Sequence, residues 1–434
     1  MKLFVTKLPA LNPAGRKGTV VFNSGGPGNE AASMPGKLVT GSDMFGTALK
    51  DMRSDYDLIG LDLRGTGLSS RLDCSIEVTD TTLEDPKQAK RQETKDNAAL
   101  ARKCFESDAA MVKSLNLQTG SRDLDTLREA LEEEKISYYG VSWGTALGVQ
   151  YRSMFPGRVD RMVLDSVMPT VFDFTTISDA DADIREANYE RFLQFIAAGA
   201  AGYQLGDTPT EVNGRLLRLR DDLDALPLKT DLGLATGRTT VTNLMAAPEM
   251  AWERSAAWLS SLSAGIVPPA MKNPIDFETP PGGDDPDQTA GTKTLTLPAQ
   301  VAYVCNDADG PRDFESAWSI YQRRLTGHPA LGTRSQSADF YCIDWPEKTS
   351  GYTPRAVTTS TPLQLVGHRD EYVTAYRFAV DTQHLIGGDL LTVDDPIHAG
   401  AYTNKCASGA LLAYFTTGTP SNMECAAEPI AALT

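Results

Sequence analysis

The residues around one serine suit nucleophilic catalysis. Ser142 is the centre of the segment GVSWG, which follows an apolar run of strand-forming residues at 136–141 and leads into a helical pattern. Gly-x-Ser-x-Gly between a strand and a helix is typical of a nucleophile elbow, a strained turn that exposes the hydroxyl. The helix N-terminus beside it favours developing negative charge. We therefore predict acyl transfer at Ser142; the alternative interpretation is that the two glycines only close a β–α turn.

A serine hydroxyl needs a base to take its proton, normally a histidine oriented by a carboxylate. The chain has four histidines, at His328, His368, His384 and His398. We predict His398 as the base, because it follows an expected strand at 389–393 by a short loop, at the sheet edge where active sites gather. His384 ends an expected helix, where a histidine more often interacts with the helix dipole. His328 precedes the returning strands, and His368 precedes the acid candidates.

The acid that orients the histidine is expected between the serine and the histidine in the chain. Asp370 and Glu371 both follow the strand expected at 362–367. We predict Asp370, because it comes first after the strand. Asp165, at the end of another expected strand, is a third candidate. We interpret it instead as a surface or helix-capping carboxylate, because the residues after it lead away into a helical segment.

A glycine-rich loop, SGGPG at 24–28, directly follows the buried strand expected at 18–23. Such a loop exposes backbone amides with no side chain in the way. It could hold a phosphate, but the Gly-Lys-Ser/Thr of a phosphate-binding loop does not follow. The alternatives are a plain tight turn or an oxyanion hole, which in elbow hydrolases combines one amide of such a loop with the amide after the nucleophile. We predict the oxyanion hole.

The elements that must position these residues alternate along the chain. Strands are expected at 1–8, 18–23, 56–63, 136–141 and 159–167, with helices at 86–105 and at 122–131 after Ser121 as the cap. Strands that alternate with helices indicate an α/β fold with a mostly parallel sheet covered by helices. The pattern resumes near the end of the chain, with strands at 362–367 and 389–393 and helices at 373–384 and 404–416.

Between these parts lies a helical segment that breaks the alternation. Helices are expected at 180–198, 211–223, 241–262 and 314–324, and a loop rich in Pro, Gly and Asp at 267–291. We predict three parts: 1–168 as the first part of the core, 169–346 as a helical lid inserted between sheet strands, and 347–434 as the second part of the core. The alternative is a separate helical domain.

Composition limits the possible partners. The chain has 434 residues, 41% of them hydrophobic, and a net charge of −16. This charge argues against nucleic acid and anionic membranes, and no apolar run reaches the roughly 18 residues of a membrane helix. We expect no metal and no cofactor, because no Cys/His cluster occurs. The start MKLFVTKLPALNP has no apolar signal-peptide core, so a leader has been removed or the protein is intracellular.

Six cysteines form three local groups along the chain. Sequential pairing is the simplest disulfide framework, and the alternative is six buried thiols. Disulfides would place the protein in an oxidising compartment, so we expect it outside the cell, with the cytoplasm as the alternative. The predicted pairs are Cys74–Cys104, Cys305–Cys342 and Cys406–Cys425.

Longer motifs in the chain are similar to those of a known family. The sequence resembles the tripeptidyl aminopeptidase branch of the α/β-hydrolase superfamily, which is related to proline iminopeptidases. The matching segments are NSGGPG at 23–28, YDLIGLDLRGTGLSSRLDC at 56–74, ISYYGVSWGTALGVQY at 136–151, FPGRVDRMVLDSV at 155–167, AYVCND at 302–307, and the GHRD and DPIHAG segments.

The resemblance implies an α/β-hydrolase fold and particular site residues. It implies a triad of Ser142, Asp370 and His398, with oxyanion amides from Gly26 and Trp143, and the family's cysteine positions resemble the three pairs. The chain departs from the family at Trp143, where a tyrosine is usual. It departs also in the residues around SGGPG and in GHRDEYVT, which lacks the usual proline and threonine pattern.

We therefore expect a serine exopeptidase or amidase that acts on short peptides with a free N-terminus. A carboxylate would bind the substrate's α-ammonium, and Glu30 and Glu186 are candidates, although acidic residues are more often plain solvated surface. An esterase, or a tailoring acyl hydrolase that makes a small molecule, is the alternative enzyme. A catalytically silent binding protein of the same fold is the non-enzyme alternative.

Overall fold

The computed structural model describes residues 1–41, 49–79, 85–229, 235–268, 292–332, 338–346, 352–357 and 361–428. The loop expected at 267–291 lies almost wholly outside the described residues. The described residues form two compact units. The first unit holds those within Met1–Ile177, Gly291–Ser319 and Ser337–Glu428, and the second those within Ser178–Ala290 and Ile320–Gln336.

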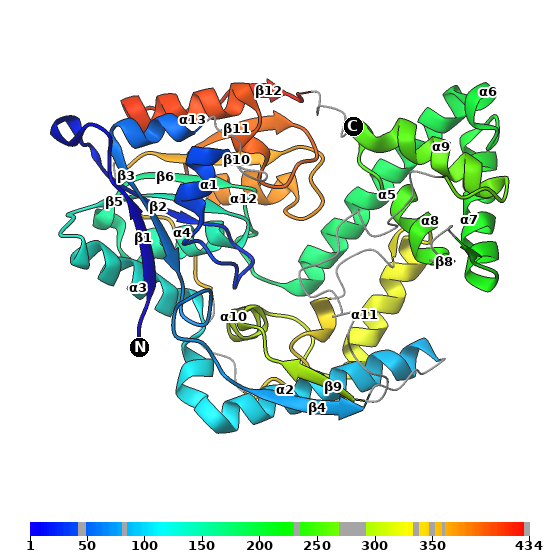
Figure 1. Cartoon of the computed structure of the whole chain (residues 1–434), viewed down its shortest axis with the longest axis horizontal. Helices are drawn as coiled ribbons and strands as arrows, with labels where there is room; N and C mark the ends of the chain where they lie inside the picture. Colours follow the sequence, from blue (N-terminus) through cyan, green and yellow to red (C-terminus); the bar gives the residue numbers. More distant parts are fainter. Residues whose placement is uncertain are drawn as a thin grey trace. The chain divides into compact units, whose positions relative to one another are not determined.

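A mostly parallel sheet is the centre of the first unit (Figure 1). Its eight strands lie in the order β1-β3-β2-β5-β6-β10-β11-β12, and β1 alone among them pairs antiparallel. The expected α/β-hydrolase sheet is confirmed. The strands are β1 (Phe4–Leu8), β2 (Gly18–Asn23), β3 (Tyr56–Asp62), β5 (Ile136–Val141), β6 (Val159–Asp165), β10 (Leu363–His368), β11 (Asp389–Asp394) and β12 (Glu424–Ala426).

The central strands are buried on both faces, as in other parallel sheets. Alternate residues enter two different cores: Val21 packs into one hydrophobic cluster, while Val20 and Phe22 pack into the other. The first cluster includes residues of α2 (Pro86–Ser114), α3 (Leu117–Ala130), α4 (Trp143–Met154) and α12 (Tyr376–Ile386). The second includes residues of α1 (Met34–Thr40) and α13 (Lys405–Thr417).

Some helix boundaries differ from the expected ones, because other residues cap or interrupt the helices. Helix α3 begins at Leu117, because the side chain of Asn116 accepts a hydrogen bond from the Thr119 amide and caps it. Ser121, the expected cap, lies inside the helix and donates to the Leu117 carbonyl. The helix expected at 241–262 is two helices, because Pro248 lies between them and cannot continue the first. These are α8 (Arg238–Met245) and α9 (Trp252–Ser263).

All three predicted disulfides are present. Cys74–Cys104, Cys305–Cys342 and Cys406–Cys425 have Cα–Cα distances of 5.4, 5.2 and 5.7 Å. The Cys406–Cys425 bridge ties α13 to β12, a short edge strand that the sequence analysis did not predict. Two further strands, β4 (Ser75–Thr79) and β9 (Thr292–Thr296), also went unpredicted and pair with each other.

The units do not follow the expected lid boundaries of 169–346. Residues 292–319 and 338–346 belong to the unit that contains the sheet. Two interactions account for this: β9 pairs with β4, and Cys305 of α10 (Ala299–Asp307) is bonded to Cys342. The inserted helical part is therefore smaller than expected.

The second unit is helical and has a hydrophobic core of its own. Phe192 of α5 (Phe174–Ala198), Leu216 of α7 (Pro209–Ala225) and Leu259 of α9 are fully buried members of this core. An ion pair of 2.8 Å joins Asp179 of α5 to the buried Arg324 of α11 (Phe314–Gly327).

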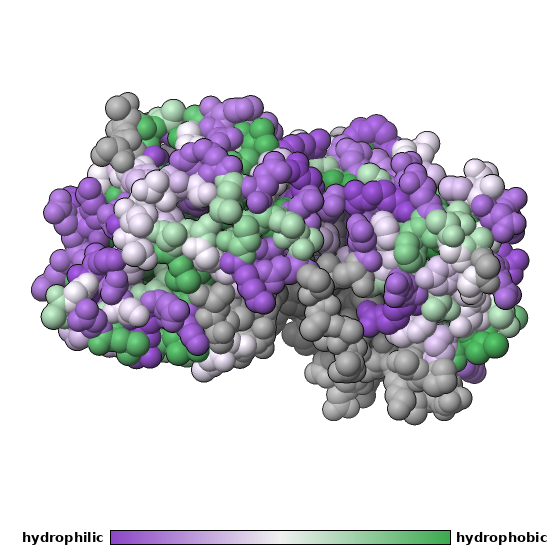
Figure 2. Space-filling model, turned by 90° about the horizontal axis from the view of Figure 1, so that it is seen from above, coloured by the Kyte–Doolittle hydropathy of each residue, from purple (hydrophilic) through white to green (hydrophobic). Residues whose placement is uncertain are grey.

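The surface shown in Figure 2 mixes hydrophilic and hydrophobic residues where it is coloured. Several large apolar side chains are well exposed, among them Leu68, Val171, Leu226 and Ile266. No helix in the described part of the chain has the length and apolar character that crossing a bilayer requires.

Candidate active site

Ser142 lies in the strained turn that its sequence motif predicts. Strand β5 ends at Val141, helix α4 begins at Trp143, and Ser142 between them has φ 56° and ψ −128°. Few residues other than glycine adopt this region. The flanking glycines are required by space: a Cβ at Gly140 would lie 2.5 Å from the Gly144 carbonyl oxygen, and one at Gly144 would lie 2.6 Å from Oδ1 of Asn23.

The end of β6 holds the turn in place. The amide of Ser142 donates to the carbonyl oxygen of Asp165 at 3.0 Å, and Val141 pairs with Asp165 in the parallel register of β5 and β6. Ser142 therefore lies at the carboxyl edge of the sheet, where neighbouring strand ends bring their loops together.

The glycine-rich loop after β2 packs directly against this turn. Gly25 has φ +80°, and a Cβ there would lie 2.4 Å from the Val141 carbonyl oxygen and 3.0 Å from the Trp143 amide nitrogen. The Gly25 amide donates to Oδ1 of Asn23 at 3.0 Å, so it is occupied, and Gly26 is the next residue of the loop. Trp143 is the first residue of α4, and a helix's first amides have no acceptor in a preceding turn.

Asp62, which the sequence analysis did not select, holds the far side of this loop. It is fully buried at the end of β3, and its Oδ1 accepts hydrogen bonds of 2.9 Å from the amides of Ala31 and Ala32. Its Oδ2 accepts from the Leu68 amide at 2.9 Å. The available sequence signal was an aspartate at the end of a buried strand, two residues before Arg64 of the RGTG segment, because a buried carboxylate must find donors.

His398 contacts Glu371. Nδ1 of His398 is hydrogen-bonded to Oε1 of Glu371, and the glutamate is fully buried. The amide of Thr374 donates to the same oxygen at 3.0 Å and the Thr374 hydroxyl also donates to it, while Ser166 donates to Oε2 at 2.9 Å. Each carboxylate oxygen therefore has a donor, so the buried charge is well stabilised.

The structure brings Glu371, and not the expected Asp370, onto the histidine. The backbone amide of Asp370 donates to the Asp395 carbonyl oxygen at 3.3 Å. The sequence predicts a strand that ends at Gly367, but β10 continues through His368. The chain then turns so that the Glu371 amide approaches the His368 carbonyl. The sequence signal that favours Glu371 is Thr374, three residues later. Its amide and hydroxyl can both donate hydrogen bonds to the glutamate carboxylate.

The charges of this pair suit general base catalysis. Burial would raise the pKa of Glu371, but His398, His368 and the Thr374 hydroxyl lower it below 4.5, so the carboxylate is ionised at neutral pH. Burial would lower the pKa of His398, but the facing Glu371 carboxylate raises it above 6.5. Among the described residues no hydrogen bond joins the Ser142 hydroxyl to His398, whose side chain is 31% exposed.

The other sequence candidates lie elsewhere. Glu30 is exposed after the glycine-rich loop, and its Oε1 accepts from Ser33. Glu186 lies on α5 within the second unit, where the Leu331 amide donates to it. Asp165 is neither a surface nor a capping residue: it is fully buried and hydrogen-bonded to His368.

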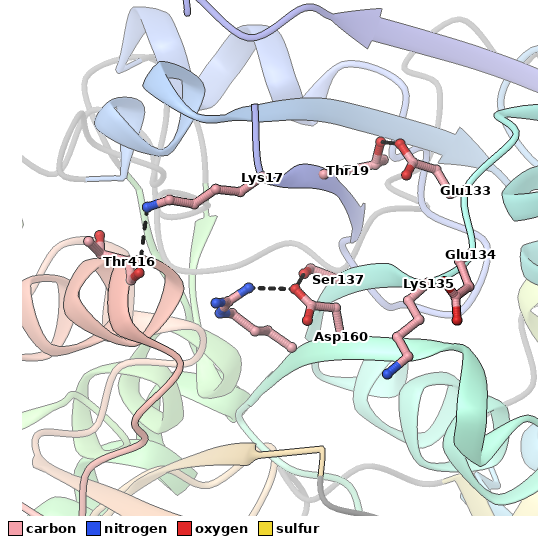
Figure 3. A pocket seen from close by; sticks show the side chains of 10 residues that line it. Lys17, Thr19, Glu133, Glu134, Lys135, Ser137, Asp160 and Thr416 are labelled. Carbon is pink, nitrogen blue, oxygen red and sulfur yellow. Dashed lines mark hydrogen bonds and ion pairs between the residues drawn. The ribbon is translucent and has the colours of Figure 1, made fainter. Parts of the chain in front are cut away.

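A pocket of about 500 Å³ lies at the amino edge of the sheet, opposite the carboxyl edge where Ser142 lies (Figure 3). Its lining includes Gly18, Ser137 and Asp160, near the amino ends of β2, β5 and β6. Ser142 follows the carboxyl end of β5, so this pocket is separate from the turn that carries Ser142. Its charges are mixed in sign, and Lys17 is hydrogen-bonded to the Thr416 carbonyl oxygen.

Comparison with known proteins assigns the chain to a family. A family model described as the alpha/beta hydrolase fold matches residues 18–257, and one described as TAP-like protein matches 328–425. The tripeptidyl aminopeptidase of Streptomyces coelicolor is 30% identical over 423 residues, 93% of this chain and 75% of that protein. The chain belongs to the α/β-hydrolase family, in its tripeptidyl aminopeptidase-like branch. It is a serine hydrolase related to peptidases.

Two other matches are more distant. The serine protease Hip1 of Mycobacterium tuberculosis is 26% identical to this hydrolase over 94% of the chain and 81% of that protein. A solved structure of a proline iminopeptidase-related protein from Thermus thermophilus is 14% identical with a TM-score of 0.39, and covers 96% of the hydrolase and 98% of that chain. The assignment rests on the two family models and the aminopeptidase.

Proposed function

We propose that the hydrolase is an aminopeptidase-type exopeptidase that cleaves short peptides through an acyl-enzyme. Ser142 is the nucleophile, His398 the base and Glu371 the acid, in place of the Asp370 expected from the sequence. The observation that carries the proposal is the buried Glu371 carboxylate on Nδ1 of His398. With Nδ1 bonded to a carboxylate, Nε2 is the nitrogen that can accept a proton.

The reaction then follows the serine hydrolase scheme. Ser142 Oγ attacks the carbonyl carbon as its proton passes to Nε2 of His398, and Glu371 stabilises the imidazolium. The amides of Gly26 and Trp143 stabilise the oxyanion, each contributing about 3 kcal/mol to lowering the barrier. The imidazolium returns the proton to the leaving amine, which departs. Water then attacks the acyl-enzyme with the same base and releases the acid product.

Peptide specificity is supported by the named activity of the relatives and by charge. The tripeptidyl aminopeptidase and Hip1 relatives are both peptidases by name. The net charge of −16 favours substrates that carry an α-ammonium group. Glu30, exposed and two residues after the SGGPG loop, is the carboxylate of the first unit that we propose for this ammonium.

Two measurements test the proposal. A fluorophosphonate probe should label the wild type and the Ser316→Ala control, a serine exposed on α11, but not Ser142→Ala. A chromogenic panel of tripeptidyl, aminoacyl and simple ester substrates should show the highest kcat/KM for a peptidyl substrate with a free amine. Labelling of Ser142→Ala would refute the nucleophile assignment. Preference for N-blocked or ester substrates would replace the exopeptidase with an esterase or acyl hydrolase.

We further propose that the hydrolase works outside the cytoplasm. Three disulfides support this, because such bonds persist in oxidising compartments. Thiol titration of denatured protein isolated from its native source should find no reactive cysteine. Six titratable thiols there would contradict the assignment.

A further inference from the structure

A second histidine lies buried beside the candidate triad. His368 is the last residue of β10 and is fully buried. Its Nδ1 is 2.7 Å from Oδ1 of Asp395, and its Nε2 is 2.9 Å from Oδ1 of Asp165. Both aspartates are themselves buried. One imidazole therefore joins the carboxyl ends of β6 and β10 to the loop after β11.

These three strand ends carry the groups assigned to catalysis. The Asp165 carbonyl oxygen accepts the amide of Ser142. Asp395 lies in the loop that carries His398, and its Oδ1 also accepts the Ile397 amide at 3.1 Å. His368 itself is three residues before Glu371. Movement of the imidazole would therefore affect the placement of the nucleophile, the acid and the base.

The packing leaves little space around the ring. A Cβ at Gly400 would lie 3.0 Å from Cε1 of His368. The ring is thus enclosed by a close backbone on one edge and by carboxylates at both nitrogens. With both nitrogens hydrogen-bonded to carboxylates, each must donate, which requires the protonated imidazolium.

We propose that His368 is a positioning residue that joins the three loops of the active site and whose positive charge offsets the buried carboxylates around His398. The proposal rests on the assignment of His398 as the base. It makes Asp165 and Asp395 partners of His368 and removes Asp165 from the acid candidates.

The groups that face His368 support a charged imidazole. Asp165, Asp395 and Glu371 are buried carboxylates, and the Tyr139 hydroxyl donates to Asp165 at 3.3 Å. Burial lowers the pKa of His368, but the hydrogen bonds to Asp165 and Asp395 outweigh burial and raise the pKa to about 10. Burial holds the pKa of Tyr139 well above 10, so this phenol stays neutral. Tyr402, beside Asp165, stays neutral for the same reason.

The positive charge of His368 affects the pKa of His398, the proposed base. Glu371 and Asp165 raise the pKa of His398, and the positive charge of His368 lowers it. His398 must be neutral to accept the serine proton, so His368 widens the pH range in which the base works. A neutral residue with the same hydrogen bonds would hold the loops but would not have this effect.

Two substitutions separate charge from structure, because both alter the hydrogen bond between His368 and Asp165 but they remove opposite charges. His368→Gln removes the positive charge and should raise the pKa on the acid limb of kcat/KM by about one unit. Asp165→Asn removes a negative charge and should lower it by a similar amount. His384→Gln, at an exposed histidine near the end of α12, is the matched control and should leave the profile unchanged.

Shifts of the same sign in both variants, or no shift in either, would overturn the charge role. Histidine NMR tests the charge of His368 without an activity assay and needs only the wild type. The His368 ring should stay doubly protonated to about pH 9. A His368 ring that is neutral at pH 7 would refute the proposal. The titration of His398 in His368→Gln is also read directly by NMR, so a failure of the proposed peptidase chemistry remains distinguishable from a failure of this inference.

Discussion

The hydroxyl of Ser166 donates a hydrogen bond of 2.9 Å to Oε2 of Glu371. Ser166 directly follows β6 and has φ 56°, a strained conformation for a residue with a side chain. The hydroxyl oxygen of Ser166 in turn accepts a hydrogen bond of 2.8 Å from the Ala399 amide. One serine therefore links the proposed acid to the residue after the proposed base.

Ser166→Ala should lower kcat by about 10- to 100-fold while the fold is kept, because small displacements of catalytic groups are costly. Steady-state kinetics and circular dichroism measure the two effects. Ser153→Ala, a buried serine on α4 that does not contact Glu371, is the control. Unchanged kcat in Ser166→Ala would mean that Thr374 and His398 alone hold the acid in place.

Ser142→Ala should abolish turnover and leave the fold intact, because the turn accommodates a small side chain. Loss of a serine nucleophile typically costs roughly 10⁴-fold or more in kcat. Activity above about 1% of the wild type, measured on protein free of contaminating hydrolases, would exclude Ser142 as the nucleophile.

Glu371→Gln should lower kcat by about 10²- to 10⁴-fold, because the imidazole loses its countercharge and the tautomer that it fixes. Asp370→Asn, one residue earlier, is the matched control and should retain most of the activity. Kinetics on the two purified variants make the comparison. The reverse ranking would return the acid role to Asp370, the residue favoured by sequence alone.

The acid limb of kcat/KM against pH should have an apparent pKa above 6.5. The Glu371 carboxylate raises the pKa of His398 above that value, and the protonated base is inactive. Activity should therefore rise with pH through a midpoint above 6.5. A midpoint at or below 6.5 in the wild type would show that His398 does not carry this charge interaction in the active enzyme.

The stability of the hydrolase should also depend on His368. Its pKa is about 10 in the folded chain against 6.5 for the unperturbed group, so folding takes up a proton between these values. The contribution is full below pH 6.5 and is lost as the pH rises through about 10. Denaturant unfolding should show the free energy of unfolding falling across this window, less steeply in His368→Gln than in His384→Gln. Equal slopes would argue against a charged His368.

Local sequence patterns determined most of the scaffold. The strand–turn–helix around Ser142, the glycine-rich loop after β2 and the alternation of strands with helices along the chain were predictable, because burial and turn geometry depend on neighbouring residue types. The three disulfides followed from the grouping of six cysteines. The choice of His398 remains a prediction, and its contact with Glu371 supports it.

The tertiary structure decided which carboxylate faces His398. Asp370 and Glu371 are adjacent, so one further residue in β10 decides which of them turns toward His398. That strand end is set by pairing with β6 and β11, which are distant in sequence. The burial of Asp165 against His368 depends on the same pairing. Sequence alone determined which residue types could do chemistry, and sheet register decided which of them meet, because contacts across strands depend on residues far apart in the chain.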